Sequence, residues 1–239
     1  MKITVMQPYF FPYLGYYQLI ESSDIFIILD EVQFIDKGWI NRNRILHPAI
    51  EKKWNYINVP LSDRKQFSKI KDVRIDNSKN WKSTILGKIS HYQSWAPNYN
   101  FIKELLENYF ENDFDKINKL CEFTIRSICS LLNIKTQIFL FSDLNLNLPK
   151  ISNPGDWALF IAKSLGGKEY INPVNGKNLF KKEDFQKHDI NLKFLEYNDF
   201  AYSQNNRKFE SKLSILDMLL CNKNFKNDTS FLKSKIIEA

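Results

Sequence analysis

The chain has 239 residues and a mass of 28.4 kDa, with 44% hydrophobic and 26% charged residues. This composition excludes a disordered or collagen-like chain, and the length suffices for one large domain or two small ones. The formal net charge of +7 comes from 28 Lys and 6 Arg without a dense basic block. We interpret it as a solvated surface, with weak affinity for an anionic substrate as the alternative.

The sequence lacks the patterns of two classes of protein, those that span a membrane and those that carry a signal peptide. No segment approaches the roughly 18 apolar residues of a membrane span, and the N-terminal residues lack the pattern of a signal peptide. The sequence therefore predicts a cytoplasmic protein without membrane insertion. Cys121, Cys129 and Cys221 are too scattered for a disulfide framework, and the three histidines are equally dispersed, so we expect buried thiols and no metal site.

Residues 3–30 have the pattern of a β-α-β unit. Residues 3–6 form a short apolar strand, residues 13–21 fit an amphipathic helix, and residues 24–30 are continuously apolar, as in a parallel strand covered on both faces. The next segment, residues 33–76, has strand patterns over 38–46, 54–60 and 70–75. We expect it to be an antiparallel insertion over the mouth of the first unit.

Helical periodicity returns over residues 78–132, with helices predicted over 80–93, 102–110 and 114–132 and a strand over 136–141. The last third alternates again. Pro154 precedes a helix over 155–165, followed by a strand over 169–171, a helix over 181–186, a strand over 191–195 and a helix over 213–221. The sequence predicts a single α/β domain over 1–239, with a Rossmann-like, mostly parallel sheet.

The first candidate site is the aromatic loop that joins the first strand to the first helix. It contains Gln7, Tyr9, Phe11, Tyr13 and Tyr16, at the carboxyl end of a strand where open α/β sheets bind ligands. The alternative is a purely structural packing wedge. The spacing resembles the nucleotidylyltransferase superfamily, in which two histidines around a glycine grip ATP phosphates. Here tyrosines replace both histidines, so the resemblance implies the fold rather than ATP activation.

A second cluster follows the second strand and includes Asp30, Glu31 and Gln33. Beyond it, an extended segment over 39–44 would place Asn41 and Asn43 on the face of Trp39, with Arg42 and Arg44 on the other. An aromatic ring beside amides suits a sugar or base, and an arginine suits a phosphate. The alternative is that Arg42 forms a structural ion pair with Asp30 or Glu31.

A third group of polar residues lies in the last third of the chain. Ser214 and Asp217 are one turn apart at a helix start, so capping or lining of that helix is the alternative to a binding role. The group consists of Asn172, Gly176, Tyr202, Gln204, Ser214 and Asp217.

Five blocks together resemble the WbqC-like protein family: residues 6–16, 30–34, 39–43, 170–173 with Gly176, and 213–217. They come in the family's order and span nearly the whole chain, although Asp30-Glu31 replaces the expected Asp-Asp. The family is associated with O-antigen and other surface-polysaccharide gene clusters, often beside amino-sugar enzymes. The resemblance therefore implies a role in surface-polysaccharide synthesis.

We accordingly expect a transferase that adds a small acyl group, such as glycyl, to the amine of a nucleotide-linked sugar. The acyl donor is either ATP with a free amino acid or a charged tRNA, and the nucleotide is dTDP, UDP or GDP. A non-catalytic binding or scaffold protein of the pathway is the alternative.

Each predicted site residue has a role in this hypothesis. Asp30 is the expected base or amine-orienting carboxylate, since amide formation needs a neutral amine. Asn41, Asn43 and Arg42 are the expected oxyanion or diphosphate donors, and Gln7 and Tyr13 position the acceptor. The expected catalytic residues are Asp30, Tyr13, Asn41 and Arg42. The expected substrate-binding residues are Gln7, Tyr9, Phe11, Tyr16, Glu31, Gln33, Trp39, Asn43, Asn172, Gly176, Tyr202, Gln204, Ser214 and Asp217.

Overall fold

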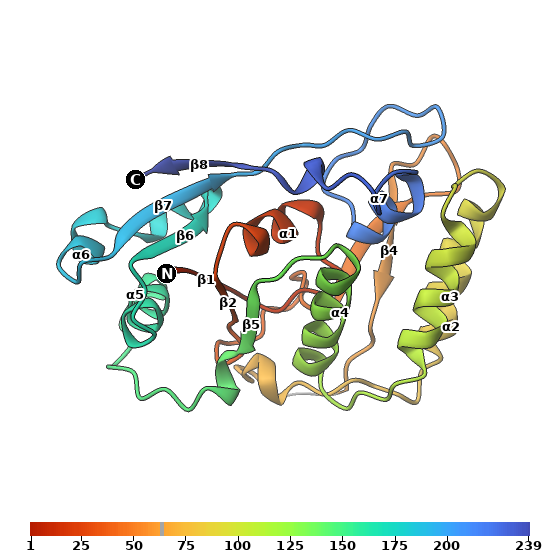
Figure 1. Cartoon of the computed structure of the whole chain (residues 1–239). Coiled ribbons are helices and arrows are strands. Elements are labelled where there is room, and N and C mark those ends of the chain that lie inside the picture. Colours follow the sequence, from red (N-terminus) through yellow and green to blue (C-terminus); the bar gives the residue numbers. More distant parts are fainter. Residues whose placement is uncertain (63–64) are drawn as a thin grey trace.

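The computed structural model describes residues 1–62 and 65–239, and its centre is a six-stranded sheet (Figure 1). The strands lie in the order β5-β2-β1-β6-β7-β8, and all run parallel except β8, which pairs antiparallel with β7. Their bounds are β1 (Lys2–Met6), β2 (Ile25–Ile28), β5 (Gln137–Leu140), β6 (Glu169–Pro173), β7 (Asn191–Glu196) and β8 (Lys235–Glu238). The predicted α/β class with a mostly parallel sheet is confirmed.

The strands β1 and β2 are apolar along their length because both sheet faces are covered there. Ile3 and Val5 belong to the core on one side, and Phe26 and Ile28 belong to the core on the other. The edge strand β8 is absent from the sequence prediction. Its residues are mostly exposed, so no run of buried apolar residues marks it.

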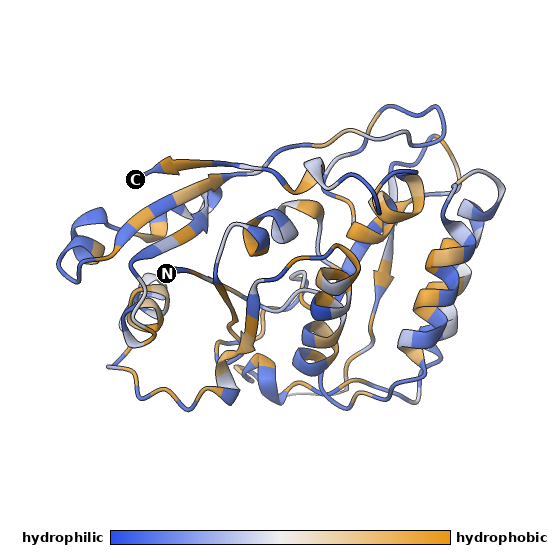
Figure 2. Ribbon diagram, in the orientation of Figure 1, coloured by the Kyte–Doolittle hydropathy of each residue, from blue (hydrophilic) through white to orange (hydrophobic). Residues whose placement is uncertain are grey.

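The helices divide between the two faces of the sheet. Helices α1 (Leu14–Glu21) and α4 (Ile117–Leu131) pack into the larger core, and α5 (Pro154–Ser164) and α6 (Lys182–Gln186) pack into the smaller one. Figure 2 shows the hydrophobic residues along the central strands, whereas α3 (Tyr99–Phe110) alternates hydrophobic and hydrophilic residues. The sheet is therefore doubly wound, and the covering helices change face between β1 and β6.

The predicted antiparallel insertion is confirmed as a separate two-stranded ribbon of β3 (Arg42–Leu46) and β4 (Trp54–Asn58). Helices α2 (Trp81–Ile89) and α7 (Ile215–Cys221) pack against it. The third predicted strand, over 70–75, is wrong. A 3-10 turn, η1 (Ile70–Asp72), occupies its first half, and isolated bridges to Leu61 and Lys116 occupy the rest.

Several predicted boundaries shift by a few residues. The strand predicted over 38–46 begins only at Arg42, because residues 36–41 form turns. The helix predicted over 80–93 ends at Ile89 and continues as a 3-10 turn. The 3-10 turn after α2 is η2 (Ser90–Ser94). The other 3-10 turns after η1 are η3 (Phe141–Asp143), η4 (Val174–Leu179) and η5 (Ser230–Leu232).

Two predictions concern the chain as a whole, namely the state of its cysteines and its membrane spans. Cys121, Cys129 and Cys221 are buried and free, as predicted, and burial raises the pKa of the Cys129 thiol to about 12. In the described residues, no helix has both the length and the apolar character needed to cross a bilayer.

A buried carboxylate joins α7 to the segments around it. Asp217 is fully buried and accepts hydrogen bonds from the Tyr92 hydroxyl, from the Tyr202 hydroxyl at 2.7 Å and from Gln204 Nε2 at 2.9 Å. The Tyr92 hydroxyl also accepts the backbone N–H of Leu46 on β3 at 2.9 Å. This network ties α7 and the loop before it to the ribbon.

We expect Asp217→Asn to lower the free energy of unfolding by about 2 kcal/mol, because its side-chain NH2 would face donor groups. Burial raises the pKa of Asp217, so the folded chain holds this proton more tightly than the unfolded chain. The resulting stabilisation is complete below the unfolded pKa and is lost as pH rises through the folded pKa. The deficit of the variant should therefore be largest in acid.

Urea unfolding between roughly pH 4 and pH 8 measures both effects. Tyr202→Phe is the control, because it removes one of the three donors to Asp217 and should cost less. Equal stability of Asp217→Asn and the wild type would contradict the structural role of this network.

Candidate functional site

A cavity of about 1010 Å3 lies at the carboxyl ends of three neighbouring strands. Met6 and Gln7 border it at the end of β1, Leu29 borders it just after β2, and Asn172 borders it near the end of β6. The covering helices change face between β1 and β6, so helices on opposite faces of the sheet flank this point. The cavity therefore occupies the switch-point crevice in which open α/β sheets bind ligands.

One wall of the cavity is formed by aromatic rings from the loop after β1. Tyr9 lies at the centre, with ring centroids 6.4 Å from Tyr13, 6.2 Å from Tyr16 and 6.1 Å from Trp39. The Tyr16 hydroxyl donates to the carbonyl of Gln7 at 3.0 Å, which fixes the loop against α1. Burial raises the pKa of Tyr9 and Tyr13, so both phenols are neutral hydrogen-bonding groups at neutral pH.

The backbone of this wall is strained and is held from two directions. Phe11 has a φ of 41°, in the left-handed region that non-glycine residues rarely occupy. Asn43 Nδ2 and Ser214 Oγ both donate to the carbonyl of Phe11, the latter at 2.8 Å. Ser214 also caps α7 through the N–H of Leu216, so the structure shows for Ser214 the capping role that was the alternative to the predicted binding role. Asn43, Phe11 and Ser214 thus shape the aromatic wall from behind.

The opposite wall comes from the start of α5 and from η4, and sequence reasoning largely missed it. Trp157, Tyr170 and Phe180 supply its rings, and the Tyr170 hydroxyl donates to Asn172 Oδ1 at 3.1 Å. A Cβ on Gly176 would collide with the Asn172 amide, which explains the glycine there. One feature of the sequence could have revealed this wall. Pro154 begins a helix that follows a strand, so the loop between that strand and the helix must start at the carboxyl edge of the sheet, where the cavity lies.

The chemistry of the lining is aromatic and uncharged. Among the described lining residues, the ionisable groups are the phenols of Tyr9, Tyr13, Tyr16 and Tyr170. Side-chain amides supply most of the other polar groups. Such a surface can stack planar or sugar rings and can orient them with neutral hydrogen bonds.

The cavity brings together only part of the predicted site. Its lining includes the predicted residues Gln7, Tyr9, Tyr13, Tyr16, Gln33, Trp39, Asn172 and Gly176. The predicted residues outside the lining are Phe11, Asp30, Glu31, Asn41, Arg42, Asn43, Tyr202, Gln204, Ser214 and Asp217. Of the four expected catalytic residues, Tyr13 alone borders the cavity.

Asp30 follows the end of β2 and is fully buried, and its carboxylate is hydrogen-bonded to other protein groups. It accepts hydrogen bonds from Asn118 Nδ2 at 2.8 Å, from the Ser142 N–H at 3.0 Å and from the Ser142 hydroxyl at 2.7 Å. These contacts connect β2 to α4 and to η3. They favour a positioning role for Asp30 over direct contact with a substrate.

The expected arrangement of residues 39–44 is wrong, because the turn over 36–41 replaces an extended strand. Trp39 lies on the side of the arginines, with the guanidinium carbons of Arg42 and Arg44 at 5.6 Å and 5.1 Å from its ring centre. Asn41 Nδ2 instead donates to the carbonyl of Val59 at 2.8 Å, across the ribbon.

The alternative of a structural ion pair between Arg42 and Asp30 or Glu31 is also wrong for the described contacts. Arg42 donates to the carbonyls of Gly38, at 2.9 Å, and of Lys37. Glu31 pairs instead with Lys69, at 2.6 Å, and with Lys71. Burial raises the pKa of Glu31, but hydrogen bonds from the two lysines outweigh it and leave the pKa below its usual range.

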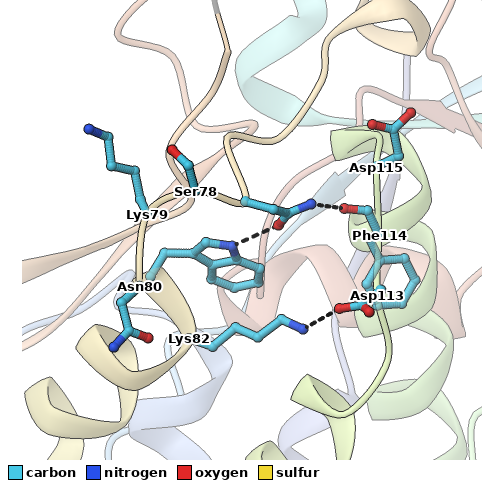
Figure 3. Close-up of a pocket in the computed structure, with 9 residues that line it drawn as sticks. Ser78, Lys79, Asn80, Lys82, Asp113, Phe114 and Asp115 are labelled. Carbon is cyan, nitrogen blue, oxygen red and sulfur yellow. Dashed lines mark hydrogen bonds and ion pairs between the residues drawn. The ribbon is translucent and has the colours of Figure 1, made fainter.

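A second cavity, of about 620 Å3, lies between the loops before α2 and α4 (Figure 3). Three polar contacts join residues of its lining. Asn77 Nδ2 donates to the Phe114 carbonyl at 2.9 Å, Trp81 Nε1 donates to Asn77 Oδ1 at 3.2 Å, and Lys82 pairs with Asp113 at 3.0 Å. These bonds clamp the two loops together, so we assign this cavity a structural role.

A doubly wound sheet with a large aromatic cavity at its switch point defines the class of this protein, an α/β fold with a candidate ligand site at that point. The chain belongs to the WbqC-like protein family, whose sequence profile matches residues 7–228. It is 26% identical to the uncharacterized protein Rv1507c of Mycobacterium tuberculosis, over 91% of this chain and 92% of that protein. No solved structure matches the chain significantly.

We expect Asp30→Asn to lower the free energy of unfolding by about 3 kcal/mol, because an amide would place donors against Asn118 and Ser142. Chemical denaturation measures the change. Glu31→Gln is a matched control on the neighbouring residue, where half-exposed lysine partners make the loss smaller. If the Asp30→Asn protein is as stable as the wild type but binds its ligand differently, Asp30 belongs to the binding site and does not serve the fold alone.

Two glycine substitutions should have opposite signs. Gly176→Ala should destabilise by about 1–3 kcal/mol, because the added methyl group meets the Asn172 amide. Gly87→Ala should stabilise by about 0.5–1 kcal/mol, because Gly87 lies inside α2 with open space around it. Thermal unfolding of both variants checks the pair. Equal effects would show that crowding at Asn172 does not fix the cavity wall.

Proposed function

We propose that the protein binds a nucleotide-linked amino sugar in the switch-point cavity and transfers a small acyl group, such as glycyl, to the sugar amine. The observation that carries this proposal is the combination of aromatic rings and amides around a cavity of about 1010 Å3. That volume is at the upper end of the range for small-molecule sites, roughly 300–1,000 Å3, which suits a two-part ligand.

The two walls suit the two rings of such a ligand. Tyr9 and Trp39 offer faces on one side, and Trp157 and Phe180 offer faces on the other. Aromatic faces bury the apolar side of a sugar or a base. Gln7 and Gln33 are exposed at the strand ends, where their amides are available to hydroxyl groups.

Family membership supports the sugar part of the proposal. The resemblance to the WbqC-like family implies a setting of surface-polysaccharide gene clusters beside amino-sugar enzymes, and the family's model matches residues 7–228. An acceptor amine on a nucleotide-linked sugar is the substrate class that this context supplies.

In the proposed reaction, the amine nitrogen attacks the acyl carbonyl of an activated donor. The carbon–nitrogen bond forms, the bond to the carrier breaks, and the carrier leaves with the proton of the amine. Tyr13 is the expected catalytic residue that borders the cavity, and its raised pKa keeps the hydroxyl protonated. A neutral phenol suits donation to the developing oxyanion. We assign Asp30 and Asn41 positioning roles behind the wall, whereas Arg42 lies on the ribbon beside Trp39.

A second candidate function is a binding or scaffold protein of the same pathway. One observation favours it: the ionisable groups among the described lining residues are phenols, and burial raises the pKa of Tyr9, Tyr13, Tyr16 and Tyr170. Neutral phenols bind well but are poor bases at neutral pH.

Calorimetric titration with dTDP-, UDP- and GDP-linked amino sugars tests the binding step. We expect one of them to bind with a Kd below about 1 mM, and Tyr13→Phe to weaken it about tenfold, or 1.4 kcal/mol. Tyr109→Phe is the matched control, because Tyr109 is a half-buried phenol on α3 outside the cavity lining. Absence of binding tighter than millimolar for every sugar would contradict the proposal.

Mass spectrometry of the sugar then separates the two candidates. The bound sugar is incubated with ATP and glycine, or with glycyl-tRNA. A product heavier by one glycyl group supports the transferase, and binding without a product supports the scaffold protein.

A further inference from the structure

One face of the β3–β4 ribbon presents arginines and aromatic rings in alternation. Arg42 and Arg44 on β3 share this face with Trp54 and Tyr56 on β4, and Trp39 from the preceding turn lies over them. The other face is buried in the core through residues such as Ile45 and Ile57. We call Trp39, Arg42, Arg44, Trp54 and Tyr56 the arginine–aromatic ladder.

The spacing within the ladder is regular. The guanidinium carbon of Arg44 lies 5.1 Å from the ring centres of both Trp39 and Trp54. That of Arg42 lies 5.6 Å from Trp39 and 4.8 Å from Tyr56. Each guanidinium group is therefore within cation–π distance of two rings, and the Cα atoms of the two arginines are about 7 Å apart along one strand.

Among the described residues, no carboxylate forms an ion pair with the arginines of the ladder. Arg42 donates to two backbone carbonyls, and Arg44 makes one long bond, of 3.3 Å, to the Lys212 carbonyl. Arg44 Nε is buried without a hydrogen-bond partner among the described residues. Two like charges side by side on one strand are unfavourable unless an anion balances them.

Further cations lie around the ribbon. Arg207 donates to the carbonyls of His47 and Pro48 at the ribbon turn, and Lys88 donates to the carbonyl of Tyr56. The turn itself contains Lys52 and Lys53. Arg207, Lys88, Lys52 and Lys53 thus add positive charge around the ribbon that carries the ladder.

The ladder is continuous with the switch-point cavity. Trp39 borders the cavity, stacks on both arginines and lies 6.1 Å from Tyr9 in the aromatic wall. Trp39 is also 39% exposed, so part of its ring remains open to a ligand. An extended ligand on the ladder would therefore end at the cavity mouth.

We propose that the arginine–aromatic ladder binds single-stranded RNA, with phosphates on the guanidinium groups and bases on the exposed parts of the rings. A single diphosphate group would need only one guanidinium group and one ring. A strand of nucleotides repeats phosphate and base, and this repeat matches the repeated cation and ring of the ladder. Proteins that bind single strands with little sequence preference use this combination.

RNA binding goes beyond the proposed function, and it also identifies the chemistry of a donor. An acyl ester on the terminal ribose of such an RNA would reach the cavity. The sugar amine would attack the ester carbonyl, forming the carbon–nitrogen bond as the ester carbon–oxygen bond breaks, and the ribose hydroxyl would keep the proton.

Fluorescence anisotropy with a labelled single-stranded RNA of about 12 nucleotides tests the proposal without any nucleotide sugar. We expect saturable binding that weakens with salt, and Arg44→Gln should weaken it about tenfold and lower the salt slope by about one. Arg126→Gln is the matched control, because Arg126 is a surface arginine on α4 paired with Glu122. The control should bind RNA like the wild type.

Trp54→Leu is a second ladder variant that tests the same proposal if Arg44→Gln does not fold. Thermal unfolding verifies that each protein is folded. Loss of affinity in a folded ladder variant, with Arg126→Gln unaffected, supports the proposal. No RNA binding by the wild type, or equal losses in the ladder and control variants, overturns it. Arg44-dependent binding to anionic vesicles in place of RNA also overturns it, because the partner would then be a lipid surface.

Discussion

The position of β1 between two parallel strands is the constraint on which the rest of the structure depends. Its residues pair with β2 on one side and with β6 on the other, and both sheet faces above it are covered. An apolar strand buried in this way cannot end at the surface without a loop that turns sharply away. The helices change face at this strand, so its carboxyl end opens into a cavity instead of meeting a helix.

The same position explains why distant segments cooperate at the cavity. The loop after β1 reverses direction through the strained backbone of Phe11, a conformation that costs free energy and persists only when neighbouring groups hold it. Asn43 from the ribbon and Ser214 from the start of α7 provide that hold. Asp217 in turn fixes α7 to the segments beside the ribbon. The ribbon and α7 therefore stabilise the aromatic wall without lining the cavity.

Cavity and ladder divide the chemistry between them. The cavity is aromatic and uncharged in its described lining, whereas the cations lie outside it on the ribbon, with Trp39 belonging to both. Neutral groups around a cavity avoid the desolvation cost of buried charges. Cations on an open face keep partial contact with water and can still attract an anion. This separation matches the ligand chemistry proposed above, with an apolar ring at one end and phosphate at the other.

The sequence by itself determined the parallel strands of the sheet and the aromatic loop after the first of them, because both depend on local patterns. The apolar strands, the prolines around residues 8–12 and the helix that follows are readable from a few neighbouring residues. Only the tertiary structure decided which polar residues face the cavity. Asp30 follows an apolar strand in sequence, but α4 and η3 enclose it, and the turn over 36–41 moved Trp39 to the side of the arginines. The edge strand β8 and the wall from α5 and η4 escaped prediction for the same physical reason: contacts between segments far apart in the chain create them, and no local periodicity records such contacts.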